Sequence, residues 1–106
     1  KPVNLMCYRT VQESVANVLK YAEATKVDIF LRIGKKNVIL TVADNGIGFD
    51  REKAEKARLN RHLGLVSMRE RIELLQGTFL LETAPGNGTK ITMLLPIDEG
   101  NDFDNV

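Results

Sequence analysis

The sequence predicts an α+β fold in which helices stack on one face of a largely antiparallel sheet. Two stretches carry apolar residues at helical spacing, and four short stretches are rich in β-branched and aromatic residues. The order is helix, two strands, a charged segment, helix, two strands. Because each pair of strands is joined by a short turn-like connection, the paired strands are expected to be antiparallel neighbours.

Composition limits what kind of protein this is. The 106 residues suffice for one small core but not for two. A net charge of +1 leaves no strong positive surface for nucleic acid or an anionic membrane, so neither is an expected partner of this fragment. The single cysteine, Cys7, excludes an internal disulfide, and no Cys/His cluster suggests zinc. A reducing, cytoplasmic location is expected.

The two ends of the chain suggest a piece of a larger protein. The sequence begins at Lys1 without an initiator methionine, and no apolar run reaches the length of a membrane span. We expect residues 1–97 to form the domain. Residues 98–106 are acidic and nearly devoid of apolar side chains, so we expect a disordered tail.

The first helix is expected over residues 5–22, where no glycine or proline interrupts the pattern. One predicted face carries the apolar residues Val11, Val15, Val18, Leu19 and Ala22. Glu13, Asn17 and Lys20 share a polar stripe on the opposite face. Such a stripe is by itself most often a solvated helix surface.

Strands are expected over residues 27–33 and 37–43, and again over 78–83 and 90–95. The second helix follows Gly64 and ends at Gly77, as helices commonly do. Its core-facing positions are Leu65, Met68, Ile72 and Leu75.

Residues 44–50 read DNGIGFD and admit three interpretations: a hairpin turn, a calcium loop, or a loop that lets the backbone approach a nucleotide. An EF-hand loop begun at Asp44 needs oxygen ligands where this chain has Gly46 and Gly48, so calcium is excluded. Asn-Gly favours a hairpin, but residues 51–61 are charged and helix-prone rather than strand-like. Two nearby glycines favour close approach of the backbone to another group.

Four segments, in order, resemble the asparagine box and the three glycine boxes of bacterial sensor histidine kinases: QESVANVLKYA, DNGIGFD, GLVSMRERI and GNGT. The resemblance spans residues 9–96, and GLVSMRERIELLQGT looks like the subfamily that includes the bacterial nitrate sensors. It implies the two-layer α/β sandwich of the histidine kinase and gyrase ATPases, known as the Bergerat fold. In that fold, helices cover one face of a mixed, largely antiparallel sheet.

The resemblance also implies an adenine site. Asp44 would accept a hydrogen bond from the adenine amino group, and Thr89 would contact adenine through Asp44 or a water. Gly46 and Gly48 would let the backbone lie against the base and sugar. Ile47 belongs to the same ATP-binding box.

For the phosphates, the resemblance assigns Asn17 to Mg²⁺ and Lys20 to the triphosphate, and places Tyr21 near the nucleotide. Glu13 would hold a metal-bound water or take part in catalysis. The catalytic residues implied are thus Glu13, Asn17 and Lys20.

Residues 50–61 resemble the ATP lid, and Gly64 and Leu65 would let the second helix present its N-terminal amides to phosphate. The family often has a further glycine where this chain has His62. His62 by itself is most often a surface loop residue, since nothing nearby supplies an orienting partner.

The reaction implied is transfer of the ATP γ-phosphoryl group to a histidine on a dimerisation domain, with a response regulator downstream. That acceptor is expected to precede Lys1, so the fragment should bind ATP and Mg²⁺ without phosphorylating itself. The fragment is expected to be monomeric and the intact protein a homodimer.

Three alternatives share the fold. An anti-sigma factor of the serine-kinase type is disfavoured by MRERIELLQG, which resembles the sensor kinases better. A nucleotide-free interaction domain is disfavoured because the residues of the boxes are retained. A gyrase-type hydrolase would need a longer chain with a second domain.

Overall fold

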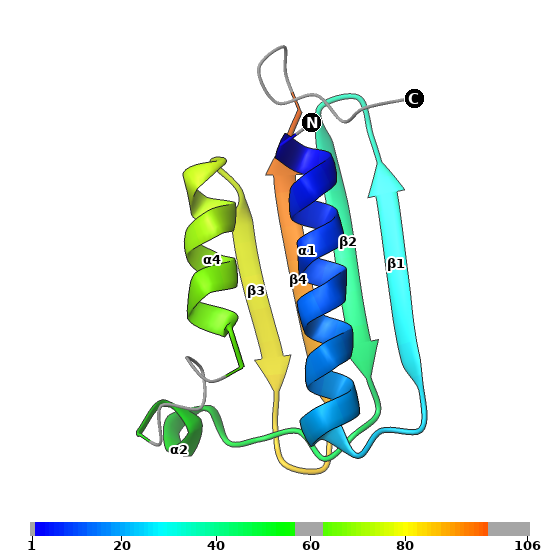
Figure 1. Ribbon diagram of the computed structural model, residues 1–106, viewed down its shortest axis with the longest axis vertical. Helices are drawn as coiled ribbons and strands as arrows, with labels where there is room; N and C mark the ends of the chain where they lie inside the picture. Colours follow the sequence, from blue (N-terminus) through cyan, green and yellow to red (C-terminus); the bar gives the residue numbers. More distant parts are fainter. Residues whose placement is uncertain (1, 57–62, 98–106) are drawn as a thin grey trace.

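The computed structural model describes residues 2–56 and 63–97 (Figure 1). The predicted tail, residues 98–106, and the second half of the predicted lid lie outside this part. The chain begins with a long helix, α1, which continues into one π-helical turn, η1. Two strands follow, then the helices α2 and α4, and then two more strands. The elements are α1 (Pro2–Asn17), η1 (Val18–Ala22), β1 (Val27–Ile33), β2 (Asn37–Asp44), α2 (Arg51–Lys56), α4 (Leu65–Leu74), β3 (Thr78–Thr83) and β4 (Thr89–Pro96).

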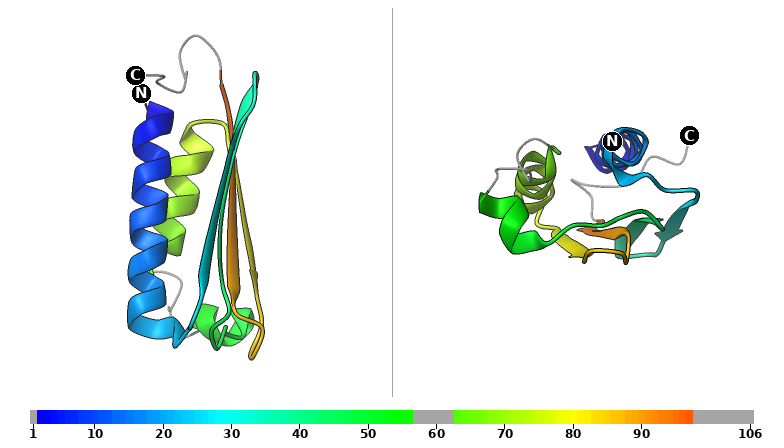
Figure 2. Two further views of the ribbon diagram at one scale, coloured as in Figure 1. Left: turned by 90° about the vertical axis from the view of Figure 1, so that its right-hand side faces the viewer. Right: turned by 90° about the horizontal axis from the view of Figure 1, so that it is seen from below.

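The strands form one sheet in the order β1-β2-β4-β3, and every neighbouring pair is antiparallel. α1 and α4 lie on the same face of this sheet, and no described helix covers the other face (Figure 2). The α+β prediction is therefore confirmed. The parallel pairing of a mixed sheet does not occur among the described strands.

Alternation along the central strands builds the core. Val38, Leu40 and Val42 of β2 are buried, and so are the residues at alternate positions of β4. α4 covers them with Leu65, Met68 and Ile72, as the helical spacing predicts; the fourth predicted position, Leu75, is partly buried.

The predicted apolar face of α1 is wrong in part. Leu19 is 81% exposed, whereas the side chains that face the sheet include Met6, Cys7, Thr10 and Ser14. Two of these are polar, so a search for apolar spacing passes over them. In addition, the wider π-helical turn of η1 shifts the last residues relative to the 3.6-residue period.

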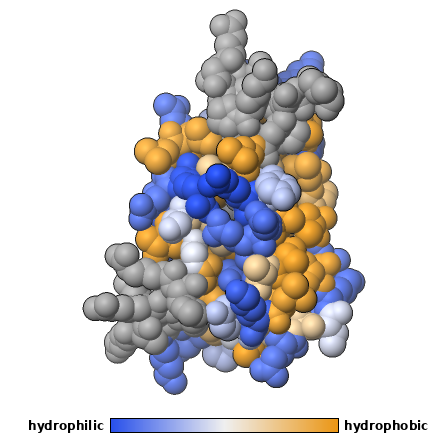
Figure 3. Space-filling view, viewed as in Figure 1, coloured by the Kyte–Doolittle hydropathy of each residue, from blue (hydrophilic) through white to orange (hydrophobic). Residues whose placement is uncertain are grey.

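β1 is an edge strand that the described helices leave partly exposed. Ile29, Leu31 and Ile33 point to the helix side, opposite the buried residues of β2, yet all three are about half exposed. Figure 3 shows hydrophobic surface on the side of the molecule that β1 occupies.

Burial of Cys7 is expected to lower the reactivity of its thiol. The side chain is 7% exposed, and desolvation raises the pKa of the thiol from 9.0 to about 11. Because the thiolate is the reactive form, iodoacetamide at pH 8 should modify the folded protein far more slowly than the urea-unfolded protein. Rapid loss of the thiol from the folded protein would contradict this. Since the unfolded state loses this proton first, Cys7 should also lower stability as pH rises from about 9 to about 11.

Candidate functional site

A pocket opens at one end of the sheet and is lined by the end of α1 and η1, the end of β2 with the segment after it, the start of α4 and the start of β4. In Figure 1, the last turn of the first helix, the end of β2 and the start of β4 lie at this end of the sheet. It encloses about 510 Å³, counting the space open to solvent at its mouth. Seven of the predicted site residues line it: Asn17, Tyr21, Asp44, Ile47, Gly48, Leu65 and Thr89. The pocket thus brings together residues from all four sequence boxes, with Leu65 from the second glycine box and Thr89 from the third.

The remaining walls are residues that the sequence analysis did not assign to the site: Ser14, Val18, Ala22, Val42, Phe49, Leu63 and Ile91. Val42 and Ile91 lie two residues from Asp44 and Thr89 on paired strands, so alternation could have identified them. Ser14 is 3% exposed, and its hydroxyl has no hydrogen-bond partner in the described part of the chain. The walls are largely apolar, which suits a flat ring between helix and sheet.

Asp44 is held by the loop that follows it. It is the last residue of β2, and its Oδ1 accepts a hydrogen bond from the backbone N–H of Gly46 at 2.8 Å. This contact fixes the carboxylate, and Oδ2 is the oxygen that remains for another donor.

Thr89, opposite Asp44 in the sheet, belongs to a short hydroxyl network. The hydroxyl of Thr83 donates to the carbonyl of Gly88 at 2.9 Å and accepts from the N–H of Phe49 at 3.1 Å. The Thr83 and Thr89 oxygens lie 3.0 Å apart. Because the single proton of Thr83 goes to Gly88, Thr89 is the donor in this pair, and its lone pairs are available as acceptors in the pocket.

The glycines of DNGIGFD serve contacts within the protein. A Cβ at Gly46 would lie 2.1 Å from the carbonyl oxygen of Ala22, which also accepts a hydrogen bond from Ile47 at 2.8 Å. At Gly48, φ is +62° and a Cβ would lie 2.1 Å from the Ala84 oxygen. Both glycines thus permit close contacts between backbone segments of the protein itself. Gly48 lines the pocket and Gly46 does not, and the approach of the backbone to a base and sugar stays a prediction.

Asn17 bridges α1 and the start of α4. Its Nδ2 donates to the carbonyl of Leu63 at 2.8 Å, which fixes the orientation of the amide. The amide oxygen Oδ1 is then the atom that could bind a cation. Gly64 precedes α4 with φ +74°, and among the described residues no side chain caps this helix, so its first amides have no side-chain acceptor there.

Glu13 and Lys20 lie outside the pocket lining, as does Gly64. The carboxylate of Glu13 forms an ion pair with Arg71 of α4 and lies beside Gly64. Lys20 is exposed. Its phosphate contact stays a prediction.

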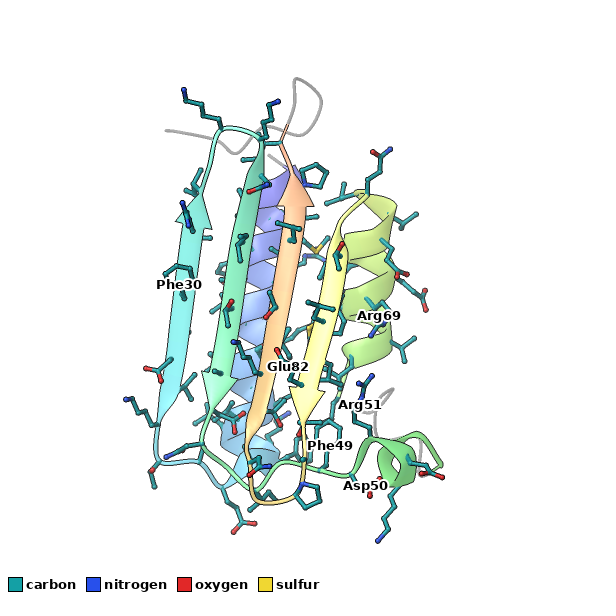
Figure 4. The ribbon with its side chains drawn as sticks, turned by 180° about the vertical axis from the view of Figure 1, so that it is seen from behind. Phe30, Phe49, Asp50, Arg51, Arg69 and Glu82 are labelled. Carbon is teal, nitrogen blue, oxygen red and sulfur yellow. The ribbon has the colours of Figure 1, made fainter. Side chains whose placement is uncertain are left out.

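The first half of the predicted lid follows the pocket wall directly. Figure 4 shows Phe49 near the ends of β3 and β4, with Asp50 and Arg51 leading into α2. Asp50 caps this helix, because its Oδ1 accepts the N–H of Lys53 at 3.0 Å. His62 lies outside the described residues.

A family model described as "Histidine kinase-, DNA gyrase B-, and HSP90-like ATPase" matches residues 3–99. The chain belongs to this ATPase family. The match confirms the predicted fold class, and ATP is the ligand that a domain of this family binds. Among the described residues, no helix is both long and apolar enough to cross a bilayer.

Members of the ATPase family with related sequences include two curated histidine kinases. DegS of Bacillus subtilis, a signal transduction histidine-protein kinase/phosphatase, is 40% identical over 90 residues, which are 85% of this chain and 23% of DegS. NreB of Staphylococcus carnosus, an oxygen sensor histidine kinase, is 37% identical over 97 residues, which are 92% of this chain and 27% of NreB. The chain thus spans about a quarter of these relatives, and the predicted resemblance to sensor histidine kinases is confirmed.

Two solved structures have a similar fold. The ATP-binding domain of PrrB from Mycobacterium tuberculosis is 28% identical with a TM-score of 0.67, covering 87% of this chain and 67% of that one. The histidine kinase AdeS of Acinetobacter baumannii, at 23% identity, shares the fold with a TM-score of 0.68 over 86% of this chain and 45% of its own.

Proposed function

We propose that this chain is the ATP-binding catalytic domain of a sensor histidine kinase that transfers the γ-phosphoryl group of ATP to a histidine on a dimerisation domain. The observation that carries the proposal is the pocket that joins the fixed carboxylate of Asp44 to the fixed amide of Asn17. One group suits the amino edge of a purine, and the other suits the cation that accompanies its phosphates.

The adenine would lie between α1 and the sheet. Oδ2 of Asp44 accepts a hydrogen bond from the exocyclic amino group, and the lone pairs of Thr89 accept from a water or the same amino group. The side chain of Ile47 and the backbone of Gly48 form the floor next to the base.

The residues present fit Mg²⁺ shared with phosphate. The described residues contain no group of three or more His, Cys, Asp or Glu side chains that could hold a metal alone, so a bound cation would take most of its ligands from water and ATP. Oδ1 of Asn17 is one suitable oxygen, and Glu13 could accept from a metal-bound water. Mg²⁺ supplies neutralisation of the phosphate charge during transfer.

The protein's own groups would hold the triphosphate at the start of α4. The uncapped amides that follow Gly64 and Leu65 form an anion site, and Lys20 and Tyr21 contact the nucleotide from η1. This positioning leaves the γ-phosphoryl group directed away from the adenine end of the pocket.

The proposal extends to the acceptor histidine and to the proteins that act with this domain. We infer a homodimer whose dimerisation domain carries the acceptor, a response regulator that receives the phosphoryl group, and a cytoplasmic location for this domain. The inference of an acceptor histidine is supported by DegS and NreB, because both are histidine kinases.

The test is phosphoryl transfer in trans. The chain is mixed with the separately produced dimerisation domain of the intact protein, γ-labelled ATP and Mg²⁺. We expect label on that domain in an acid-labile, base-stable linkage, which is typical of phosphohistidine. An acid-stable label would favour the serine-kinase alternative, and nucleotide binding without any transfer would favour a binding module.

Asn17→Ala should remove the magnesium dependence of ATP binding. Without the amide oxygen, the affinity for ATP in the presence of Mg²⁺ should fall by about tenfold, while the affinity for ATP in its absence should change little. The lost hydrogen bond to Leu63 should cost about 1 kcal/mol of stability. Asn45→Ala is the matched control, because it also removes amide hydrogen bonds, to Thr25 and Lys26, outside the pocket. An unchanged magnesium dependence in Asn17→Ala would contradict the assignment.

A further inference from the structure

An ion pair beside the pocket includes Arg71, a residue to which the proposed function gives no role. Glu13 of α1 contacts the Nη2 atom of Arg71, which lies in the last turn of α4, and the two side chains are only 32% and 29% exposed. Nε of Arg71 is buried and has no hydrogen-bond partner in the described part of the chain. The guanidinium therefore neutralises Glu13 through one nitrogen without completing the bidentate pairing that arginine favours.

The position of Glu13 brings its negative charge close to the expected phosphate end of the pocket. It lies one turn before Asn17, and its Oε2 would be 2.7 Å from a Cβ at Gly64, the residue that precedes α4. The carboxylate is thus at the end of the pocket where the uncapped amides of α4 begin. An isolated carboxylate here would repel the phosphates of a bound nucleotide.

We propose that Arg71 is a positioning residue whose charge cancels that of Glu13 and so makes this end of the pocket compatible with a triphosphate. The inference rests on the proposed function, because it concerns the phosphates of the same nucleotide. Arg71 acts through Glu13 and not by contacting the ligand. It keeps Glu13 turned toward α4, where the carboxylate can order water without facing the γ-phosphate unpaired.

A purely structural role explains the pair less well. Both side chains of this pair are mostly buried, so the loss of hydration opposes the attraction between the charges, and the unpartnered Nε adds a cost. An arrangement that breaks a local rule without stabilising the fold is expected at functional sites.

The test is a double-mutant cycle on nucleotide affinity, measured by calorimetry with ATP and with AMP. Arg71→Gln should lower the affinity for ATP by about tenfold, because Glu13 is left unpaired. It should change the affinity for AMP by less than about twofold. Titrated without Mg²⁺, so that the water of a bound cation plays no part, Glu13→Gln together with Arg71→Gln should return the affinity for ATP to within about threefold of the wild type. Arg71→Lys keeps the charge and should retain the affinity for ATP.

Arg69→Gln is the matched control. It makes the same substitution on the same helix, but the guanidinium carbon of Arg69 lies 5.0 Å from the centroid of the Phe79 ring. Figure 4 labels Arg69 on α4. It should leave the affinity for ATP unchanged.

Two results would overturn the inference. If Arg71→Gln lowered the affinities for ATP and AMP equally, the role of Arg71 would be structural. If the double variant bound ATP as weakly as Arg71→Gln, Arg71 would act on the ligand directly. Thermal unfolding of each variant shows whether it is folded. Failure of the wild type to bind ATP would instead contradict the proposed function, so the two failures are distinguishable.

Discussion

Asp44→Asn is expected to lower the affinity for ATP by about 100-fold or more while leaving the protein folded. An amide oxygen can still accept the N–H of Gly46, as Oδ1 does now. The amide nitrogen then takes the place of Oδ2, so that a donor faces the amino group of adenine where an acceptor is required. The loss is therefore one of recognition and not of structure.

Calorimetric titration with ATP measures this effect, and thermal unfolding checks the fold. Asp28→Asn is the matched control, since it makes the same substitution on β1, where Asp28 forms an exposed ion pair with Lys26 at 3.9 Å. The control should bind ATP like the wild type. Equal affinities in Asp44→Asn and the wild type would mean that Asp44 does not recognise adenine.

Gly48→Ala is expected to destabilise the fold by at least about 3 kcal/mol. The backbone there has φ +62°, which an L side chain rarely adopts, and the new Cβ would lie 2.1 Å from the carbonyl oxygen of Ala84. Since Gly48 also lines the pocket, nucleotide binding should be lost together with the local structure.

Gly86→Ala separates the two causes of that loss. Gly86 has φ +82°, but a Cβ there would meet nothing within 4 Å, so only the conformational cost of about 1 kcal/mol should appear. Chemical denaturation of both variants measures the difference. Similar midpoints for the two would show that the contact with Ala84 is not the reason for the glycine at position 48.

Element order could be predicted because periodicity is a local property. Alternation in β2 and β4 and the spacing in α4 follow directly from which side chains the core accepts. The inward face of α1 could not be predicted in the same way. Thr10 and Ser14 are buried in positions that usually carry apolar residues, and the hydroxyl of Thr10 contacts the sulfur of Met93, 83 positions further along the chain.

The same distinction between local patterns and tertiary contacts applies to the candidate site. Asp44 and Asn17 could be predicted because the boxes carry them, and the structure brings both into one pocket. The constraint on Gly46 comes from Ala22, and the partner of Glu13 is Arg71, 58 positions away. Contacts of this kind depend on tertiary packing, which no local pattern reports.

The most direct test of the account is a calorimetric titration of the wild-type chain with ATP in the presence and absence of Mg²⁺. The account predicts one binding site per chain, with tighter binding when Mg²⁺ is present. Absence of binding under both conditions, with the chain shown to be folded by circular dichroism, would contradict it.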